Sequence, residues 1–317
     1  MPGMRTWTEA DITDQTGRTV LVTGANSGLG LRTSAVLAAK GARVLIACRD
    51  AERGARALRA VSALATTEPE LISLDLADLD SVRAAAIRVE EVTGGSLDVL
   101  VNNAGLMGAP QGRTKDGFEL QFGTNYLGHA VLTWLLLPAL RRGKDARVVT
   151  LSSLAAAGAR VDFTDPNFER RRYNPALAYG QSKIANQIFA LELDRRLRAA
   201  GDDVISVAAH PGYTATNLNS TMARAQGNPL VRAAVAGVTF LGDVLLAQGV
   251  RTGALPTLVA ATAAGVNGGD YIGPRHLRGL RGSPAVVPPL RPALDRENGR
   301  KLWALTAELT GVTPDPA

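Results

Sequence analysis

A glycine-rich segment between a short apolar run and a helical stretch constrains the fold of this chain most. The run Thr19–Thr23 is apolar and rich in β-branched residues, and the glycines that follow it are Gly24, Gly28 and Gly30. Strand, glycine turn and helix in this order are typical of a phosphate-binding turn. Gly24 would allow the tight turn, Gly28 the approach of pyrophosphate, and Gly30 the packing of helix on strand. The spacing G-x-x-x-G-x-G departs from G-x-G-x-x-G, and plain turn glycines are the alternative.

Strand-like and helix-like segments alternate along residues 1–317. This alternation predicts an α/β fold in a single domain, a doubly wound Rossmann-type parallel sheet flanked by helices. We expect strands near 19–23, 43–48, 71–74, 98–102, 147–152, 204–209 and 270–272. We expect helices near 28–40, 51–65, 79–93, 118–140, 178–199, 252–263 and 293–310. Several prolines predict that no regular element precedes the last helix, namely Pro274, Pro284, Pro288, Pro289 and Pro292.

The composition is that of a globular protein. Hydrophobic residues make up 46% and charged residues 20%, which is ample for a core and unlike a disordered chain. The net charge is +6, but the basic residues are spread along the chain, so we expect no nucleic-acid partner. The single cysteine, Cys48, excludes an internal disulfide, and with three histidines it argues against a zinc site. No metal is expected.

The apolar runs are too short for a membrane span, which needs roughly 18–20 apolar residues. The first residues of the chain are charged at several positions and do not resemble a signal peptide: Arg5, Glu9, Asp11, Asp14 and Arg18. A cytoplasmic location is therefore expected. A homo-oligomer is among the states that the sequence allows.

Tyr179 and Lys183 lie four residues apart in a stretch with helical character, so their side chains share one face. A nearby ammonium favours the phenolate, which predicts a tyrosine pKa well below the ~10 of a free phenol. Such a tyrosine could exchange a proton near neutral pH. The spacing alone is common, and a solvated helix face is the alternative.

Taken in order from about residue 17 to 275, the motifs of this chain resemble the short-chain dehydrogenase/reductase family. They are Thr23-Gly24-x-x-x-Gly28-x-Gly30, Asn102-Asn103-Ala104-Gly105, Asn125, Ser152-Ser153, Tyr179-x-x-x-Lys183 and Pro211-Gly212-x-x-x-Thr216. Four further segments are similar to the retinol-dehydrogenase-like branch: Ala47-Cys48-Arg49-Asp50, Thr124-Asn125-Tyr126-Leu127-Gly128-His129, Arg172-Tyr173-Asn174-Pro175 and Gly269-Asp270-Tyr271-Ile272-Gly273-Pro274.

The resemblance implies four catalytic residues, Asn125, Ser153, Tyr179 and Lys183. Tyr179 would act as general acid/base on the substrate oxygen, and Lys183 would hold the nicotinamide ribose and favour the phenolate. Adjacent strand residues face opposite ways, so only one of Ser152 and Ser153 reaches the substrate, and the family pattern selects Ser153. Asn125 would bend its helix or hold a water that relays protons to Lys183. The alternatives are a strand-end turn for Ser153 and a surface position for Asn125.

The resemblance also implies a dinucleotide site. Its residues are Gly24, Asn26, Ser27, Gly28, Leu29, Gly30, Arg49, Asp75, Leu76, Asn103, Ala104, Gly105, Tyr179, Lys183, Pro211, Gly212, Thr214 and Thr216. The second strand ends at Cys48 without a carboxylate for a ribose, and Arg49 follows, which favours NADP(H). NAD(H) is the alternative, because Asp50 could bind a ribose hydroxyl. Asp75 would border the adenine, or else act as a helix N-terminal acid.

We therefore expect an NADP(H)-dependent oxidoreductase that interconverts a small apolar alcohol and its aldehyde or ketone by hydride transfer. Residues 217–250 are rich in apolar side chains and glycines, which predicts a substrate lid, although core packing or a dimer contact would explain the same residues. Residues 275–317 form a C-terminal extension. The alternative functions are a carbon–carbon double-bond reductase of the same family and a non-catalytic dinucleotide-binding regulator.

Overall fold

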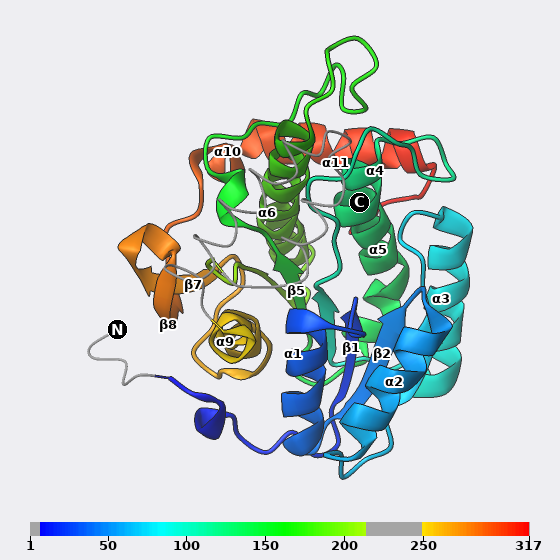
Figure 1. The fold of residues 1–317 in the computed structure, drawn as a ribbon, viewed down its shortest axis with the longest axis vertical. Coiled ribbons are helices and arrows are strands. Elements are labelled where there is room, and N and C mark those ends of the chain that lie inside the picture. The colour runs from blue at the N-terminus through cyan, green and yellow to red at the C-terminus, as the bar shows by residue number, and fades with distance from the viewer. Residues whose placement is uncertain (1–6, 214–248, 317) are drawn as a thin grey trace, which may run out of the picture.

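The computed structural model describes residues 7–213 and 249–316 (Figure 1). The predicted lid therefore lies outside the described residues, apart from Gly249 and Val250. One mixed sheet with helices on both faces makes up the described part, as the alternation of elements predicts.

The sheet has eight strands in the order β3-β2-β1-β4-β5-β6-β7-β8. Their bounds are β1 (Thr19–Thr23), β2 (Arg43–Cys48), β3 (Glu70–Ser73), β4 (Val99–Asn102), β5 (Arg147–Leu151), β6 (Ile205–Ala209), β7 (Tyr271–His276) and β8 (Arg281–Val286). The first seven are parallel, and all seven were predicted. The strand order reverses between β1 and β4, and such a reversal leaves a crevice at the carboxyl ends of the strands.

Two groups of helices cover the two faces of the sheet. On one face lie α1 (Gly28–Ala39), α2 (Ala51–Ser62) and α9 (Val250–Thr262), which share one apolar cluster with the strands. On the other lie α3 (Leu79–Thr93), α5 (Gly128–Arg141) and α6 (Pro175–Ala199), with a second cluster. The central strands β1, β2, β4, β5 and β6 are buried on both sides, as their continuous apolar runs require.

The prediction that prolines prevent regular structure before the last helix is wrong. Pro274 and Pro284 lie opposite each other in the antiparallel pair of β7 and β8. Strand β8 is the edge of the sheet, where a missing backbone N–H costs least. The predicted final helix is divided into α10 (Arg291–Leu294) and α11 (Arg296–Thr310).

The helix predicted over residues 118–140 is interrupted. A short α4 (Leu120–Phe122) leads into a π-helical turn at Gly123–Leu127, and α5 follows directly. π-helical turns are rare in proteins, and those that do occur are often found at functional sites. Helix α6 begins earlier than predicted, because the Asn174 side chain accepts hydrogen bonds from two backbone N–H groups of its first turn.

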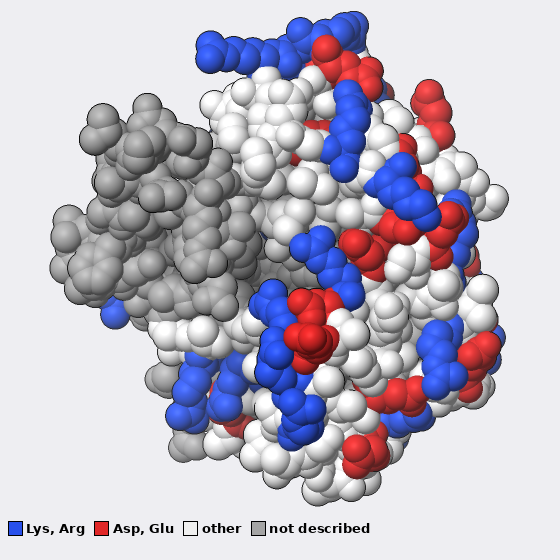
Figure 2. Space-filling model, turned by 45° about the vertical axis from the view of Figure 1, so that its right-hand side comes forward, with Lys and Arg blue, Asp and Glu red and all other residues white. Residues whose placement is uncertain are grey.

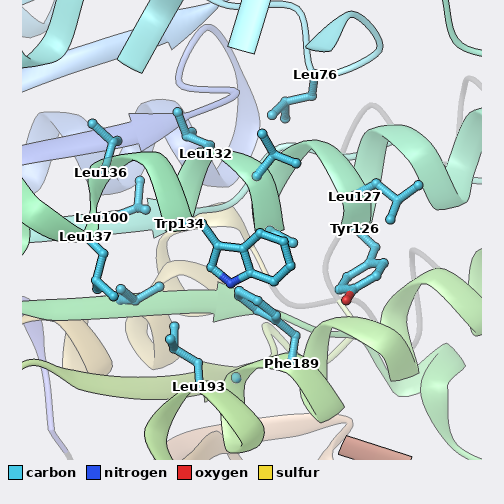
Figure 3. Packing of buried hydrophobic residues seen from close by; sticks show 14 of the residues in the cluster. Leu76, Leu100, Tyr126, Leu127, Leu132, Trp134, Leu136, Leu137, Phe189 and Leu193 are labelled. Carbon is cyan, nitrogen blue, oxygen red and sulfur yellow. The ribbon is translucent and has the colours of Figure 1, made fainter. Parts of the chain in front are cut away.

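An aromatic cluster lies between α5, α6 and α11. Figure 3 shows Trp134 of α5 and Phe189 of α6 side by side in the core. From α11, Trp303 stacks on Phe189 with ring centroids 5.6 Å apart, and it meets Trp134 edge-on at 4.9 Å. The C-terminal extension is therefore part of the core of the domain.

Charged side chains of both signs are interspersed on the face seen in Figure 2. Among the helices of residues 7–213 and 249–316, none has the length and the apolar character that crossing a membrane requires.

Candidate active site

A cleft of about 380 Å³ lies at the carboxyl ends of the central strands. It brings together these predicted residues: Gly24, Asn26, Ser27, Gly28, Leu29, Gly30, Arg49, Asp75, Leu76, Asn103, Ala104, Gly105, Ser153, Tyr179, Lys183, Pro211 and Gly212. Asn125 is fully buried behind the lining. Thr214 and Thr216 belong to the part of the chain that the structure does not describe.

The glycine turn leaves space where a ligand must approach. Gly28 has a φ of +55°, and a Cβ at this position would meet no atom within 4 Å. At Gly30, by contrast, a Cβ would lie 2.5 Å from the Gly24 carbonyl oxygen and from Asn103 Nδ2. Gly30 therefore serves packing, whereas Gly28 faces open space beside the helix N-terminus, where an anion is favoured.

Thr23, at the end of β1, connects the glycine turn to the Asn-Asn-Ala-Gly segment. Its Oγ1 accepts hydrogen bonds from the backbone N–H groups of Asn103 at 2.9 Å and Ala104 at 3.0 Å. Asn103 Nδ2 in turn donates to the Thr23 carbonyl at 2.7 Å. The sequence predicted that Asn103 to Gly105 face the cofactor, but it did not predict that Thr23 holds this segment in place. Thr23 and its hydrogen-bond partners are about eighty residues apart in the sequence.

His129 links Thr23 to the π-helical turn. Its Nδ1 lies 2.9 Å from the carbonyl oxygen of Asn125, and its Nε2 lies 2.8 Å from Thr23 Oγ1. A carbonyl can only accept, so Nδ1 carries the proton and Thr23 donates to Nε2. Burial lowers the pKa of His129 to about 3, which keeps the ring neutral. The sequence signal available for this contact was the spacing of four residues between Asn125 and His129.

Asn125 holds the loop that follows β4, so the surface alternative for it is wrong. Its Oδ1 accepts from the Leu106 N–H at 2.7 Å, and its Nδ2 donates to the Leu106 carbonyl at 2.9 Å. Nδ2 also contacts Ser182 Oγ at 2.9 Å. A Cβ at Gly105 would lie 3.1 Å from Asn125 Oδ1 and 3.4 Å from Lys183 Nζ, so both groups border the same point of the cleft.

The two serines after β5 face opposite ways. Ser152 Oγ is buried and donates to the Lys183 carbonyl at 2.8 Å. Ser153 lines the cleft together with Tyr179 and accepts a hydrogen bond from the Ala155 N–H at 3.2 Å. Ser153 is therefore the serine that a substrate oxygen beside Tyr179 would meet.

The predicted depression of the Tyr179 pKa is wrong for this structure. Burial raises the pKa of Tyr179, and the nearby Ser153 hydroxyl only partly opposes this effect. Lys183 Nζ lies 5.9 Å from the tyrosine ring centroid and donates to the Leu151 carbonyl at 3.1 Å. Burial lowers the pKa of Lys183 to about 8. Desolvation thus opposes charge on both groups, and Tyr179 is held as a neutral proton donor.

The end of β2 presents two arginines to the cleft. Arg49 and Arg53 are both exposed and both line it. Asp50 is engaged elsewhere, because its Oδ1 caps α2 by accepting from the Arg53 N–H at 2.9 Å. Sequence reasoning missed Arg53. The sequence feature that could have identified Arg53 is a basic residue in the first turn of a helix, where the helix dipole disfavours positive charge unless an anion binds there.

Asp75 lines the cleft between Leu74 and Leu76. Its Oδ1 accepts from the Ala77 N–H at 3.0 Å, while Asp78 caps α3. The alternative that Asp75 is a helix N-terminal acid is therefore wrong.

Comparison with known proteins agrees with this geometry. The family model of the short chain dehydrogenases matches residues 18–227. Retinol dehydrogenase 13 of Homo sapiens is 38% identical over 299 residues, which cover 93% of this chain and 85% of that protein. Polyprenol dehydrogenase of Mus musculus is 41% identical over 303 residues, which cover 94% and 85%.

Two solved structures are also similar. An uncharacterised protein from Mycobacterium paratuberculosis has a TM-score of 0.80 at 42% identity, covering 99% of this chain and 100% of its own. Pseudomonas aeruginosa RhlG, solved as an active-site complex with NADP, has a TM-score of 0.62 at 26% identity, covering 81% and 94%.

The chain belongs to the short-chain dehydrogenase/reductase family. Within that family it lies in the retinol-dehydrogenase-like branch, and it is an oxidoreductase that acts on CH–OH groups.

Proposed function

We propose that this protein uses NADP(H) to interconvert an apolar alcohol and its aldehyde or ketone. The observation that carries the proposal is that Tyr179, Ser153 and Lys183 line one cleft together with the glycine turn. A non-catalytic regulator on this fold would need none of these three side chains.

A dinucleotide phosphate fits the residues present. The open side of Gly28 at the N-terminus of α1 suits a pyrophosphate, and the arginines Arg49 and Arg53 suit a 2′-phosphate. The capping role of Asp50 removes the carboxylate that would favour NAD(H). The NADP that RhlG binds supports the same choice. When bound, the cofactor supplies or accepts the hydride.

The protein residues manage the proton and the substrate oxygen. Ser153 donates a hydrogen bond that holds the carbonyl oxygen and favours negative charge on it. Tyr179, held neutral by burial, donates its proton to that oxygen during reduction and becomes a phenolate. In the oxidation direction this phenolate takes the proton from the alcohol, which restores the neutral side chain. The retinol and polyprenol named for two relatives support an apolar substrate, as do Leu106, Met107 and Leu151 in the cleft lining.

The change Tyr179→Phe tests the proposal, because it removes only the phenol hydroxyl. We expect NADPH binding to persist while the turnover of an apolar aldehyde or ketone falls by ~10²-fold or more, the scale of a lost general acid. NADPH oxidation across retinoid, steroid, quinone and medium-chain carbonyl compounds measures turnover, and product analysis distinguishes an alcohol from a saturated carbonyl.

A matched control is Tyr173→Phe, which removes a phenol hydroxyl outside the cleft, where it donates to the Ala109 carbonyl at 3.0 Å. Turnover of this variant should stay near the native value per folded molecule. Near-native turnover in Tyr179→Phe would remove the proton-transfer role from that residue.

A further inference from the structure

A second cavity, of about 320 Å³, adjoins the cleft at Ser153, which lines both. Its walls come from the turn after β5, from β7 and from the segment after β8. Most of the wall is apolar, formed by Leu154, Ala157, Pro274, Val287, Pro288 and Leu290. A substrate whose reacting oxygen lies at Ser153 can therefore extend an apolar group into this second cavity.

His210, at the end of β6, is a buried polar group on this wall, with 3% of its surface exposed. Its Nδ1 accepts a hydrogen bond from the Gly212 N–H at 3.3 Å, so the proton of the neutral ring is on Nε2. Burial lowers the pKa of His210 to about 4, which keeps the ring neutral. Among the hydrogen bonds of the described ranges, that with Gly212 is the one the His210 ring makes, so Nε2–H remains available on the cavity wall.

The surrounding backbone makes room for the imidazole. A Cβ at Gly273 would lie 1.9 Å from Nε2, and one at Gly279, which also lines the cavity, would lie 3.0 Å from Cε1. The Tyr271 ring packs on the imidazole with centroids 5.0 Å apart, and the nearby Ser152 hydroxyl partly opposes the rise that burial causes in the pKa of Tyr271. Arg275 also lines the cavity, but its side chain is exposed. The Nε2–H is therefore the buried donor that this wall offers to a ligand.

We propose that the second cavity is a substrate subsite in which His210 donates a hydrogen bond to an uncharged oxygen of the substrate. This inference rests on the proposed function and narrows its substrate class. The preferred compounds are apolar carbonyls or alcohols that carry a second oxygen, as a hydroxyl, ether or keto group, remote from the reacting carbon. An apolar compound without that oxygen would leave the imidazole N–H unpaired, and sites with unpaired polar groups discriminate against such compounds.

The test uses straight-chain aldehydes of increasing length, each with a terminal methyl or a terminal hydroxyl group. For each length, the ratio of kcat/KM for the hydroxyl compound to that for the methyl compound is measured with NADPH. At the length that reaches the subsite, we expect the native ratio to exceed that of His210→Leu by about tenfold, the effect of one buried hydrogen bond. His210→Gln, which keeps a donor, should recover part of the preference.

A control variant, Val287→Ala, enlarges the apolar wall without changing a donor. It should alter kcat/KM for both members of a pair by the same factor. Melting temperature and NADPH affinity, measured on each variant, separate a lost contact from a misfolded protein. A ratio that is equal in the native protein and in His210→Leu at every length would overturn the subsite while leaving the proposed function intact.

Binding distinguishes the two proposals if no aldehyde is reduced. Calorimetry of the corresponding amides, which do not react, on the NADPH-bound protein measures the same preference without turnover. Preferential binding of hydroxyl amides that is lost in His210→Leu supports the subsite even if the reaction is a different one. Equal binding of methyl and hydroxyl amides contradicts the subsite directly.

Discussion

Lys183 is a lysine with little solvent contact, and its surroundings disfavour its charge. Its side chain is 5% exposed, and burial lowers its pKa from 10.5 to about 8. The sequence suggested that its ammonium would depress the pKa of Tyr179, an effect that requires the attraction to exceed the cost of desolvation. In the folded protein the desolvation of the phenolate is the larger effect.

This shift has a measurable consequence for stability. Between about pH 8 and pH 10.5 the unfolded chain keeps the Lys183 proton that the folded chain has lost, so the free energy of unfolding should rise with pH there. Lys183→Met should remove that rise and should be more stable at pH 7 by up to ~3 kcal/mol, given about 1.4 kcal/mol per pKa unit. Denaturant unfolding of both proteins across this range measures the difference, and a difference that does not change with pH would contradict it.

At the scale of single residues, motifs located the cleft lining well, because strand ends in a parallel sheet converge on one edge. Gly28, Asp75 and Tyr179 come from distant parts of the sequence and meet there. The residues that hold this lining in place were not predictable. Thr23 and His129 act through partners that only the folded chain brings near. Asn125 is fully buried behind the cleft lining and is not part of it.

The junction of β2 and α2 is the element that we expect to select the cofactor. Arg49, which follows β2, and Arg53, in the first turn of α2, both line the cleft. Replacing either by alanine should weaken NADPH binding by ~1–3 kcal/mol, the contribution of a charge-assisted hydrogen bond, and should leave NADH binding nearly unchanged. Dissociation constants for both cofactors at one salt concentration provide the measurement.

The control for this prediction is on the same helix. Arg56 carries the same charge, lies outside the cleft lining, and pairs with Glu52 at 3.9 Å. Arg56→Ala changes the net charge equally and should affect NADPH binding far less. If Arg56→Ala weakens NADPH binding as much as the cleft variants do, the effect is a general one of charge. If the native protein binds NADPH and NADH with equal affinity, the proposed preference for NADP(H) is wrong.

The helices and strands were predicted correctly wherever the hydrophobic pattern and the turn residues of the sequence indicated the same element. The pattern and the turn residues disagreed in two places. The prolines led us not to predict β8, because an edge strand tolerates proline where a central strand does not. The π-helical turn before α5 lies where the Asn125 side chain binds Leu106 after β4 and the His129 ring binds Thr23 at the end of β1. The partners Leu106 and Thr23 are distant in sequence from Asn125 and His129, so neither of these two contacts has a local signature.

At the scale of the whole molecule, α11 completes the core between α5 and α6. Trp303→Ala would remove a side chain that is 3% exposed and touches Phe189 and Trp134. We expect a loss of ~3–5 kcal/mol in the free energy of unfolding, as for other buried aromatics. No described residue of α11 lines the cleft, so the folded fraction should bind NADPH as the native protein does.

Denaturant unfolding with NADPH titration checks both parts of this prediction. The control is Lys301→Ala on the same helix, where the side chain is 54% exposed and its ion pair with Glu297 is at 3.5 Å. It should change stability by less than about 0.5 kcal/mol. A Trp303→Ala protein of native stability would show that α11 is dispensable to the core.

The position of Trp303 also orders events during synthesis. Helices α5 and α6 leave the ribosome long before α11, and until α11 arrives the aromatic side chains Trp134 and Phe189 lack the ring that covers them. A nascent chain in this state exposes an apolar surface between α5 and α6, and such surfaces are prone to aggregation. We therefore expect the risk of aggregation during synthesis to be greatest between the emergence of Phe189 and that of Trp303.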